Sequence, residues 1–154
     1  MSLVLRDGSE LSNEALFAIP VNGDGWRLLP DKTRIKVGNE VQVGNEARVG
    51  NEARIGNEAR VGNGAQVGDG ARVGNEARIG NGAQFEKSPL AVQGTRHIAY
   101  QYDKGLIGVG CEIHTLEEWL ATGLGIAADN GYTTAEAEEY RRIIQFIADN
   151  SVEV

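Results

Sequence analysis

Cysteine, histidine and aromatic residues are scarce in this sequence, and each shortage excludes a class of protein. Cys111 is the only cysteine, so no internal disulfide and no cysteine-only zinc site can form, which fits a reducing cytoplasm. Two histidines are too few for a histidine-rich metal centre, and we expect no metal and no cofactor. Aromatic residues make up 6% of 154 residues, a length typical of a single domain.

Long apolar runs and an excess of basic charge are also missing. No stretch approaches the ~18 consecutive apolar residues of a membrane span, so we expect no membrane contact. A signal peptide is not predicted, because Asp7, Gly8 and Ser9 interrupt the N-terminal residues before they reach the length of an apolar signal-peptide core. Lysine and arginine total 15 against 22 acidic residues, and this net charge of −7 disfavours direct nucleic-acid binding. These features predict a cytoplasmic protein.

Glycine is abundant, with 21 residues, and many of them belong to a six-residue repeat. Eight copies run without a gap from Val37 to Gln84: VGNEVQ, VGNEAR, VGNEAR, IGNEAR, VGNGAQ, VGDGAR, VGNEAR and IGNGAQ. Each copy alternates a small, a polar and an aliphatic residue, which is the period of a strand with one buried face. Gly-Asn is expected to form each corner because both residues tolerate a positive φ. A helix is a poor alternative, since each glycine would destabilise it by ~1 kcal/mol and the six-residue period does not match the ~3.6 residues of a helical turn.

Hexapeptide periodicity is typical of parallel β-helices. The pattern aliphatic-Gly-Asn-x-Ala-x resembles the left-handed β-helix of the hexapeptide-repeat family, in which three hexapeptides form one triangular coil of about 18 residues. The resemblance implies a mainly β protein with about three coils. It divides the chain into an N-terminal capping segment (1–36), the β-helix (37–84) and a C-terminal segment with a β-hairpin and two helices (85–154).

Outward side chains 18 residues apart are expected to stack in a row along the axis of such a coil. Neighbouring members of one row then lie ~4.8 Å apart. The acidic row at one corner consists of Glu40, Glu58 and Glu76. The basic row on one face consists of Lys36, Arg54 and Arg72. We interpret both rows first as the solvated surface of a repeat. A phosphate-binding role is the alternative for the basic row, and an interaction role is the alternative for the acidic row.

The segments beside the repeat are expected to cap its open ends. A short helix near residues 13–18 is predicted before Pro20, and Phe17 and Trp26 are expected to pack in the cap. After the repeat, strands are predicted at 97–102 and 106–111.

Two helices follow these strands in the prediction. Thr115 and Thr133 each precede a glutamate by three residues, the spacing of a capping box. The inward stripe of the first helix is expected to contain Leu116, Trp119, Leu120 and Leu124. The inward stripe of the second is expected to contain Ala137, Tyr140, Ile143, Ile144 and Ile147.

The stretches HTLEEWL, GYT and EEYRRIIQFI within residues 97–148 resemble the C-terminal part of small tailed-phage and prophage proteins of unsettled function. Residues 85–154 carry eleven acidic and five basic side chains, a net charge of −6. Glu136, Glu138 and Glu139 lie on the last predicted helix. They form either a solvated helix face or an acidic surface that binds a basic protein.

Candidates for catalysis are few. The hexapeptide-repeat resemblance implies a trimeric acyltransferase with a histidine base beside an acyl-CoA cleft, yet the repeat of this chain has no histidine. His97 is the remaining candidate for a general base. His114 is expected to pack against Trp119, and Cys111 is expected to be a buried thiol. No GxGxxG, P-loop, HExxH or GxSxG motif occurs.

These observations favour a non-enzymatic, phage- or prophage-encoded interaction module. It would bind a host protein complex in the bacterial cytoplasm through its acidic surface, for example as an anti-CRISPR-like inhibitor of a defence system. The alternatives are a trimeric acyltransferase using acyl-CoA and a structural virion or trimerisation module. Homo-oligomers are compatible with all three, since flat faces rich in alanine and glycine pack readily.

Overall fold

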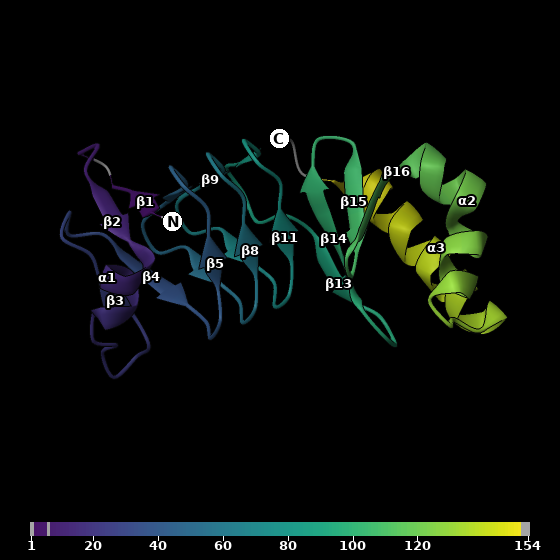
Figure 1. The fold of residues 1–154 in the computed structure, drawn as a ribbon, viewed down its shortest axis with the longest axis horizontal. Coiled ribbons are helices and arrows are strands. Elements are labelled where there is room, and N and C mark those ends of the chain that lie inside the picture. Colours follow the sequence, from purple (N-terminus) through teal and green to yellow (C-terminus); the bar gives the residue numbers. More distant parts are fainter. Residues whose placement is uncertain (1, 6, 152–154) are drawn as a thin grey trace.

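The fold consists of a strand-rich repeat with a cap at one end and a sheet with two helices at the other (Figure 1). The computed structural model describes residues 2–5 and 7–151. The N-terminal segment and helices α2 and α3 lie at opposite ends of the long axis, with the repeat between them. Within the described residues, no helix is both long and apolar enough to span a bilayer.

Parallel strands of two to four residues form the repeat. They are β4 (Arg34–Val37), β5 (Gln42–Val43), β6 (Arg48–Val49), β7 (Arg54–Ile55), β8 (Arg60–Val61), β9 (Gln66–Val67), β10 (Arg72–Val73), β11 (Arg78–Ile79) and β12 (Gln84–Phe85). Every third strand joins the same sheet, giving β4-β7-β10, β5-β8-β11 and β6-β9-β12. Arg54 pairs with Lys36 on one side and with Arg72 on the other. The predicted 18-residue stacking is therefore confirmed.

The interior of the repeat contains the aliphatic and alanine positions, as the alternation predicts. Val43, Val61 and Ile79 of one sheet are at most 3% exposed, and the alanines from Ala47 to Ala83 are at most 2% exposed. The stacked asparagines bond along the axis, since the backbone nitrogen of Asn39 donates to Oδ1 of Asn57 at 2.8 Å. The same bond recurs at Asn45, Asn51, Asn57 and Asn63, with Asp69 as the acceptor for Asn51, and it satisfies the backbone N–H groups of these corners.

The corner geometry differs from the prediction. The residue after each asparagine, rather than Gly-Asn itself, adopts a positive φ: Glu58 has φ 60° and Gly64 has φ 68°. The repeat glycine is required for a different reason. A Cβ on Gly56 would lie 2.5 Å from the backbone nitrogen of Asn75 in the next turn of the repeat. Close approach of two backbones therefore selects glycine here.

The N-terminal segment closes one end of the repeat. It contains β1 (Ser2–Val4), β2 (Glu10–Ser12), α1 (Asn13–Ala18) and β3 (Arg27–Leu28). Strand β3 pairs antiparallel with β4, β1 reaches β6 through a bridge from Leu3 to Ala47, and Asn13 of α1 donates to the carbonyl oxygen of Val43 at 3.3 Å. Each of the three sheets thus has its first edge covered.

The predicted packing of the two cap aromatics is half right. Trp26 is 7% exposed, as expected for a cap residue. The prediction for Phe17 is wrong, because its side chain is 36% exposed and the Arg27 guanidinium lies 5.4 Å from its ring centre. Leu16, one residue earlier in α1, is the fully buried side chain of this helix.

The C-terminal segment has more strands than the predicted hairpin. A four-stranded antiparallel sheet contains β13 (Ala91–Gln93), β14 (Ile98–Asp103), β15 (Leu106–Val109) and β16 (Glu112–Thr115). Gly110 has φ 58°, so the strand predicted for 106–111 ends at Val109 and the chain reverses. Cys111 lies in this turn and is exposed, which corrects the prediction of a buried thiol.

This sheet is shared between two hydrophobic cores. From one face, Ile98 and Tyr100 pack on the end of the repeat, and the backbone nitrogen of Gly80 donates to the carbonyl oxygen of Tyr102 at 3.0 Å. From the other face, Ala99 and Ile107 pack against the helices. The sheet therefore closes the second end of the repeat and carries the helices on its far side (Figure 1).

Helices α2 (Leu116–Asp129) and α3 (Thr134–Asn150) begin at the two predicted capping boxes, and both boxes are complete. The stripe of α3 is confirmed, with its buried side chains at Tyr140, Ile144 and Ile147. The prediction of the inward stripe of α2 is wrong in part. Trp119 is buried, but Leu120 and Leu124 are 52% and 65% exposed.

Substitution of Val61 tests the inward register. Val61 is 3% exposed in β8, and we expect Val61→Asp to abolish cooperative folding because it would bury an unpaired carboxylate. Urea unfolding followed by circular dichroism measures the effect. The control is Arg60→Asp at the neighbouring exposed position, which should keep a cooperative transition. An unchanged midpoint for Val61→Asp would contradict the register.

Candidate functional site: a groove between the sheet and the helices

A groove of about 240 Å³ lies between the C-terminal sheet and its two helices. Most of its lining is apolar and comes from α2, α3 and the turn between β15 and β16. The lining residues include Val109, Cys111, Glu112, Trp119, Leu120, Gly123, Leu124, Ile126, Ala127, Tyr140, Arg141 and Ile144, with His97 and Tyr132 among the polar ones. An apolar lining with a few polar groups is typical of binding sites.

Helix α2 supplies both a fixed wall and an exposed rim. The indole nitrogen of Trp119 donates to the carbonyl oxygen of Ile107 at 2.9 Å, which ties the helix to β15. His114 meets the same ring edge-on at 4.8 Å between ring centres, so the predicted contact is confirmed. Gly123 adds no side chain beside the indole, and Leu120 and Leu124 stand at the rim more than half exposed.

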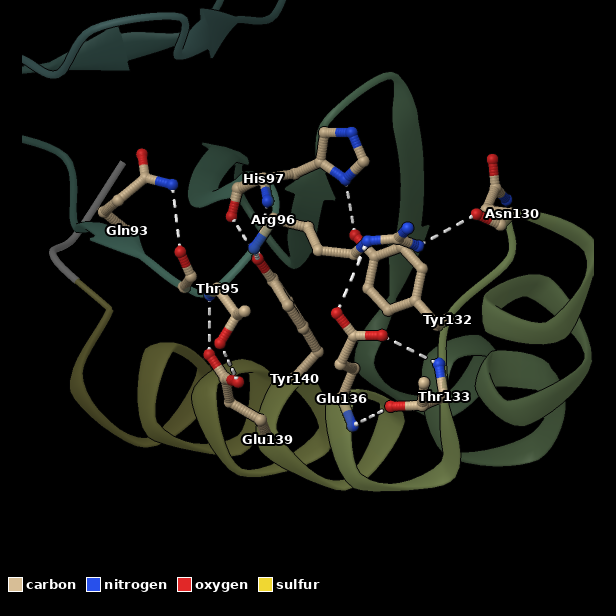
Figure 2. Close-up of polar contacts among 11 residues, drawn as sticks. Gln93, Thr95, Arg96, His97, Asn130, Tyr132, Thr133, Glu136, Glu139 and Tyr140 are labelled. Atoms are coloured by element: carbon tan, nitrogen blue, oxygen red, sulfur yellow. Dashed lines mark hydrogen bonds and ion pairs between the residues drawn. The ribbon is translucent and has the colours of Figure 1, made fainter.

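Tyr140 of α3 joins the helices to the segment before β14. The backbone nitrogens of Arg96 and His97 donate to the Tyr140 hydroxyl oxygen at 2.9 and 2.6 Å, and the hydroxyl donates to the carbonyl oxygen of His97 at 2.6 Å. One hydroxyl thus uses its donor and both of its acceptor sites (Figure 2). Gly94 leaves space for the ring, since a Cβ there would lie 2.6 Å from it.

His97 is held by Tyr132, which follows the turn between α2 and α3. The His97 Nδ1 lies 2.5 Å from the Tyr132 hydroxyl oxygen, and the two rings stack (Figure 2). Burial raises the pKa of Tyr132 to about 12, so its hydroxyl stays neutral at physiological pH. The His97 side chain is exposed. A general base acting through Nε2 requires that Nδ1 carries the proton and donates to Tyr132.

Two of the three predicted interaction glutamates of α3 contribute to the same network. Glu136 accepts from the backbone of Thr133, which lowers the pKa of Glu136, and it pairs with Arg96 at 3.4 Å. Glu139 accepts hydrogen bonds from the backbone nitrogen and the hydroxyl of Thr95. Both carboxylates thus hold α3 on the loop before β14 (Figure 2).

The remaining predicted interaction residues lie elsewhere. Glu138 pairs with Arg141 at 3.1 Å, which brings it beside a residue of the groove. Glu40, Glu58 and Glu76 occupy exposed corners of the repeat. The structure therefore keeps the two predicted acidic groups on separate parts of the molecule.

Sequence reasoning missed the groove because it depends on which helix side chains remain uncovered. The spacing of Leu120 and Leu124 indicates a shared face but not whether a partner element covers it. Cys111 is also part of the lining, with its Sγ 3.2 Å from Nη2 of Arg78. Within the described residues, no three histidine, cysteine or acidic side chains gather to hold a metal ion.

The comparisons with known proteins concern the repeat. The family described as bacterial transferase hexapeptide (six repeats) matches residues 52–87, where the parallel strands recur with the same period. This stretch is a hexapeptide-repeat segment. Proteins of this family are usually transferases or trimeric repeat proteins, and they often form homo-oligomers. No curated protein and no solved structure matches the chain. The hexapeptide-repeat match ends before the groove, so it assigns nothing to it.

Tyr140→Phe tests how firmly the groove is held together. The change leaves two backbone N–H groups without their acceptor, and we expect it to lower the free energy of unfolding by about 1–3 kcal/mol. Chemical denaturation measures the loss. Tyr132→Phe removes one hydrogen bond to a side chain and should cost less. Equal stability of Tyr140→Phe and the wild type would show that the network is dispensable.

Proposed function

We propose that the chain is a protein-interaction module and that the groove between the sheet and the helices receives an apolar-faced, basic segment of a partner. The observation that supports this proposal most directly is the pair of exposed leucines, Leu120 and Leu124. They lie on the rim of an apolar groove whose wall is fixed by Trp119. Monomeric proteins seldom expose adjoining large apolar side chains beside a groove without using them.

Charge supports the choice of a basic partner. The C-terminal segment carries −6 of the total charge of −7. Glu112 lines the groove, and Glu138 lies next to it through its pair with Arg141. A basic segment would be attracted by this field and would bury the leucines on docking. Glu112 pairs with His114 at 2.9 Å and Glu138 pairs with Arg141, but both carboxylates lie at or beside the groove and are about half exposed, so they are the acidic groups we assign to the interface.

The architecture and setting of this module are the finer parts of the proposal. The VGNEAR pattern and the 18-residue pairing support a left-handed β-helix of about three coils, with 1–36 and 85–154 as its flanking segments. The resemblance of residues 97–148 to tailed-phage proteins supports a phage or prophage origin. We propose cytoplasmic action on a host protein complex, as in an anti-CRISPR inhibitor, because the chain is small and acidic and because of this resemblance.

Replacing Leu124 by aspartate should remove partner binding. The bait variants are wild type, Leu124→Asp and Leu28→Asp, since Leu28 and Leu124 are both 65% exposed but Leu28 lies in the N-terminal cap. We expect one host complex to be retained by wild type and Leu28→Asp from bacterial lysate. Its recovery should fall about tenfold or more with Leu124→Asp, because the apolar contact is lost and a carboxylate would have to be desolvated against the apolar face of the partner, which outweighs its attraction to the basic groups.

Mass spectrometry of proteins retained at low and at high salt gives the readout. Loss of the complex at high salt is expected, because a charge contribution is screened there. Retention of the same complex by Leu124→Asp at wild-type levels would contradict a role for the groove.

A trimeric acyltransferase is the second candidate, favoured by the match of residues 52–87 to the transferase hexapeptide family. His97 would be its general base, with Nδ1 donating to Tyr132 and Nε2 facing the acceptor.

Acyl transfer from acetyl-CoA to an amine tests this candidate. If it holds, His97→Ala should lower the rate about 10²–10⁴-fold. His114→Ala, the matched control, removes the other histidine and should leave the rate unchanged. Turnover that is absent in the wild type, or equal in both variants, would exclude the transferase.

A further inference from the structure

The three faces of the repeat differ in the charge of their outward rows. On β4, β7 and β10 the row is Lys36, Arg54 and Arg72. The second face carries Gln42, Arg60 and Arg78, and the third carries Arg48, Gln66 and Gln84. Two faces thus interrupt the cations with glutamine, whereas the first face has a cation at every position.

The cations of this basic row have no acidic partner among the described residues. No carboxylate oxygen of that part of the chain lies within 4.0 Å of the charged nitrogens of Lys36, Arg54 or Arg72. Glu52 is close by but pairs with Arg34 at 3.3 Å. Like charges on adjacent strands repel one another, so the row costs stability unless an anion binds it.

Trp26 holds two members of the row in place. The ammonium of Lys36 lies 4.9 Å and the guanidinium of Arg54 lies 5.1 Å from a ring centre of the indole. Trp26 is itself buried, so these side chains are oriented before any ligand arrives. Arg72 extends the row beyond the indole, at an exposed position.

A shallow groove of about 510 Å³ runs along the row. Its lining combines the three cations with Gly38, Gly56 and Gly74, which contribute no side chains. The groove is shallow and open to solvent, so an anion can reach all three cations.

We propose that this basic row is a binding site for a compact oligophosphate anion. The guanidinium forks of Arg54 and Arg72 suit phosphate oxygens two at a time, and Lys36 adds a third positive charge. Neighbouring members of the row lie ~4.8 Å apart on adjacent strands, and their long side chains can converge on the oxygens of linked phosphates in one small molecule. A long polyanion fits less well, because the row has three positions and the whole chain carries a charge of −7.

Calorimetric titration with sodium tripolyphosphate at low salt tests the site. The double variant Arg54→Gln/Arg72→Gln introduces the residue that the other faces already carry at this position, so the fold should be retained. We expect its affinity for tripolyphosphate to fall at least about tenfold. The matched control Arg48→Gln/Arg60→Gln makes the same charge change on the other two faces and should alter affinity less than about twofold.

Circular dichroism unfolding confirms that both double variants are folded. A parallel titration with ATP separates a free oligophosphate from a nucleotide-linked one, and either is consistent with the site if Arg54→Gln/Arg72→Gln weakens it. Absence of binding by wild type, or equal weakening in both double variants, would overturn the proposal. Tighter binding of a single-stranded DNA 20-mer through the same row would also overturn it in favour of nucleic acid.

Discussion

The close approach of each repeat glycine to the next turn of the backbone is the constraint on which the rest of the repeat depends. At Gly56 the neighbouring backbone leaves no room for a Cβ, and the adjoining asparagines bond to one another along the axis. These two contacts set one register for all three sheets. Once that register is set, each outward residue is placed directly beside its counterparts 18 residues away. The residue type at the outward position of each hexapeptide thus determines the chemistry of the surface rows of the repeat.

The sheet formed by β13, β14, β15 and β16 joins the repeat to the C-terminal helices, because it packs against both. Alternate residues of β14 pack into the two cores, with Tyr100 against the repeat and Ala99 against the helices. Tyr100 requires Gly108 beside it on β15, since a Cβ there would lie 2.3 Å from the ring. The groove and the basic row therefore belong to one continuous set of packed elements.

Repetition and local capping chemistry made much of the fold predictable. The alternation in each hexapeptide identified buried alanines such as Ala59, and the Thr-x-x-Glu spacing located the start of both long helices. The cap and the groove were less accessible from sequence, because their key contacts join residues far apart. The Tyr140 hydroxyl donates a hydrogen bond to the carbonyl oxygen of His97, which lies 43 residues earlier, and no local sequence pattern predicts such a pair.

Two errors have a common physical origin. The exposed Leu120 and Leu124, and the turn at Gly110 that adds β16, depend on what neighbouring elements cover. Helical periodicity defines a face of α2, but only the tertiary arrangement decides how much of that face the sheet and α3 reach. Likewise a glycine inside a strand-like run indicates a break without giving the direction of the returning chain.

The 18-residue pairing also makes the length of the repeat adjustable. Each strand bonds only to the strands before and after it in its own sheet, so neither end of the molecule depends on how many rungs separate them. Duplication or deletion of three hexapeptides would move the capped N-terminal end and the helical end by one rung, ~4.8 Å, while each end keeps its own contacts. The molecule is in this sense a spacer whose span changes in fixed steps.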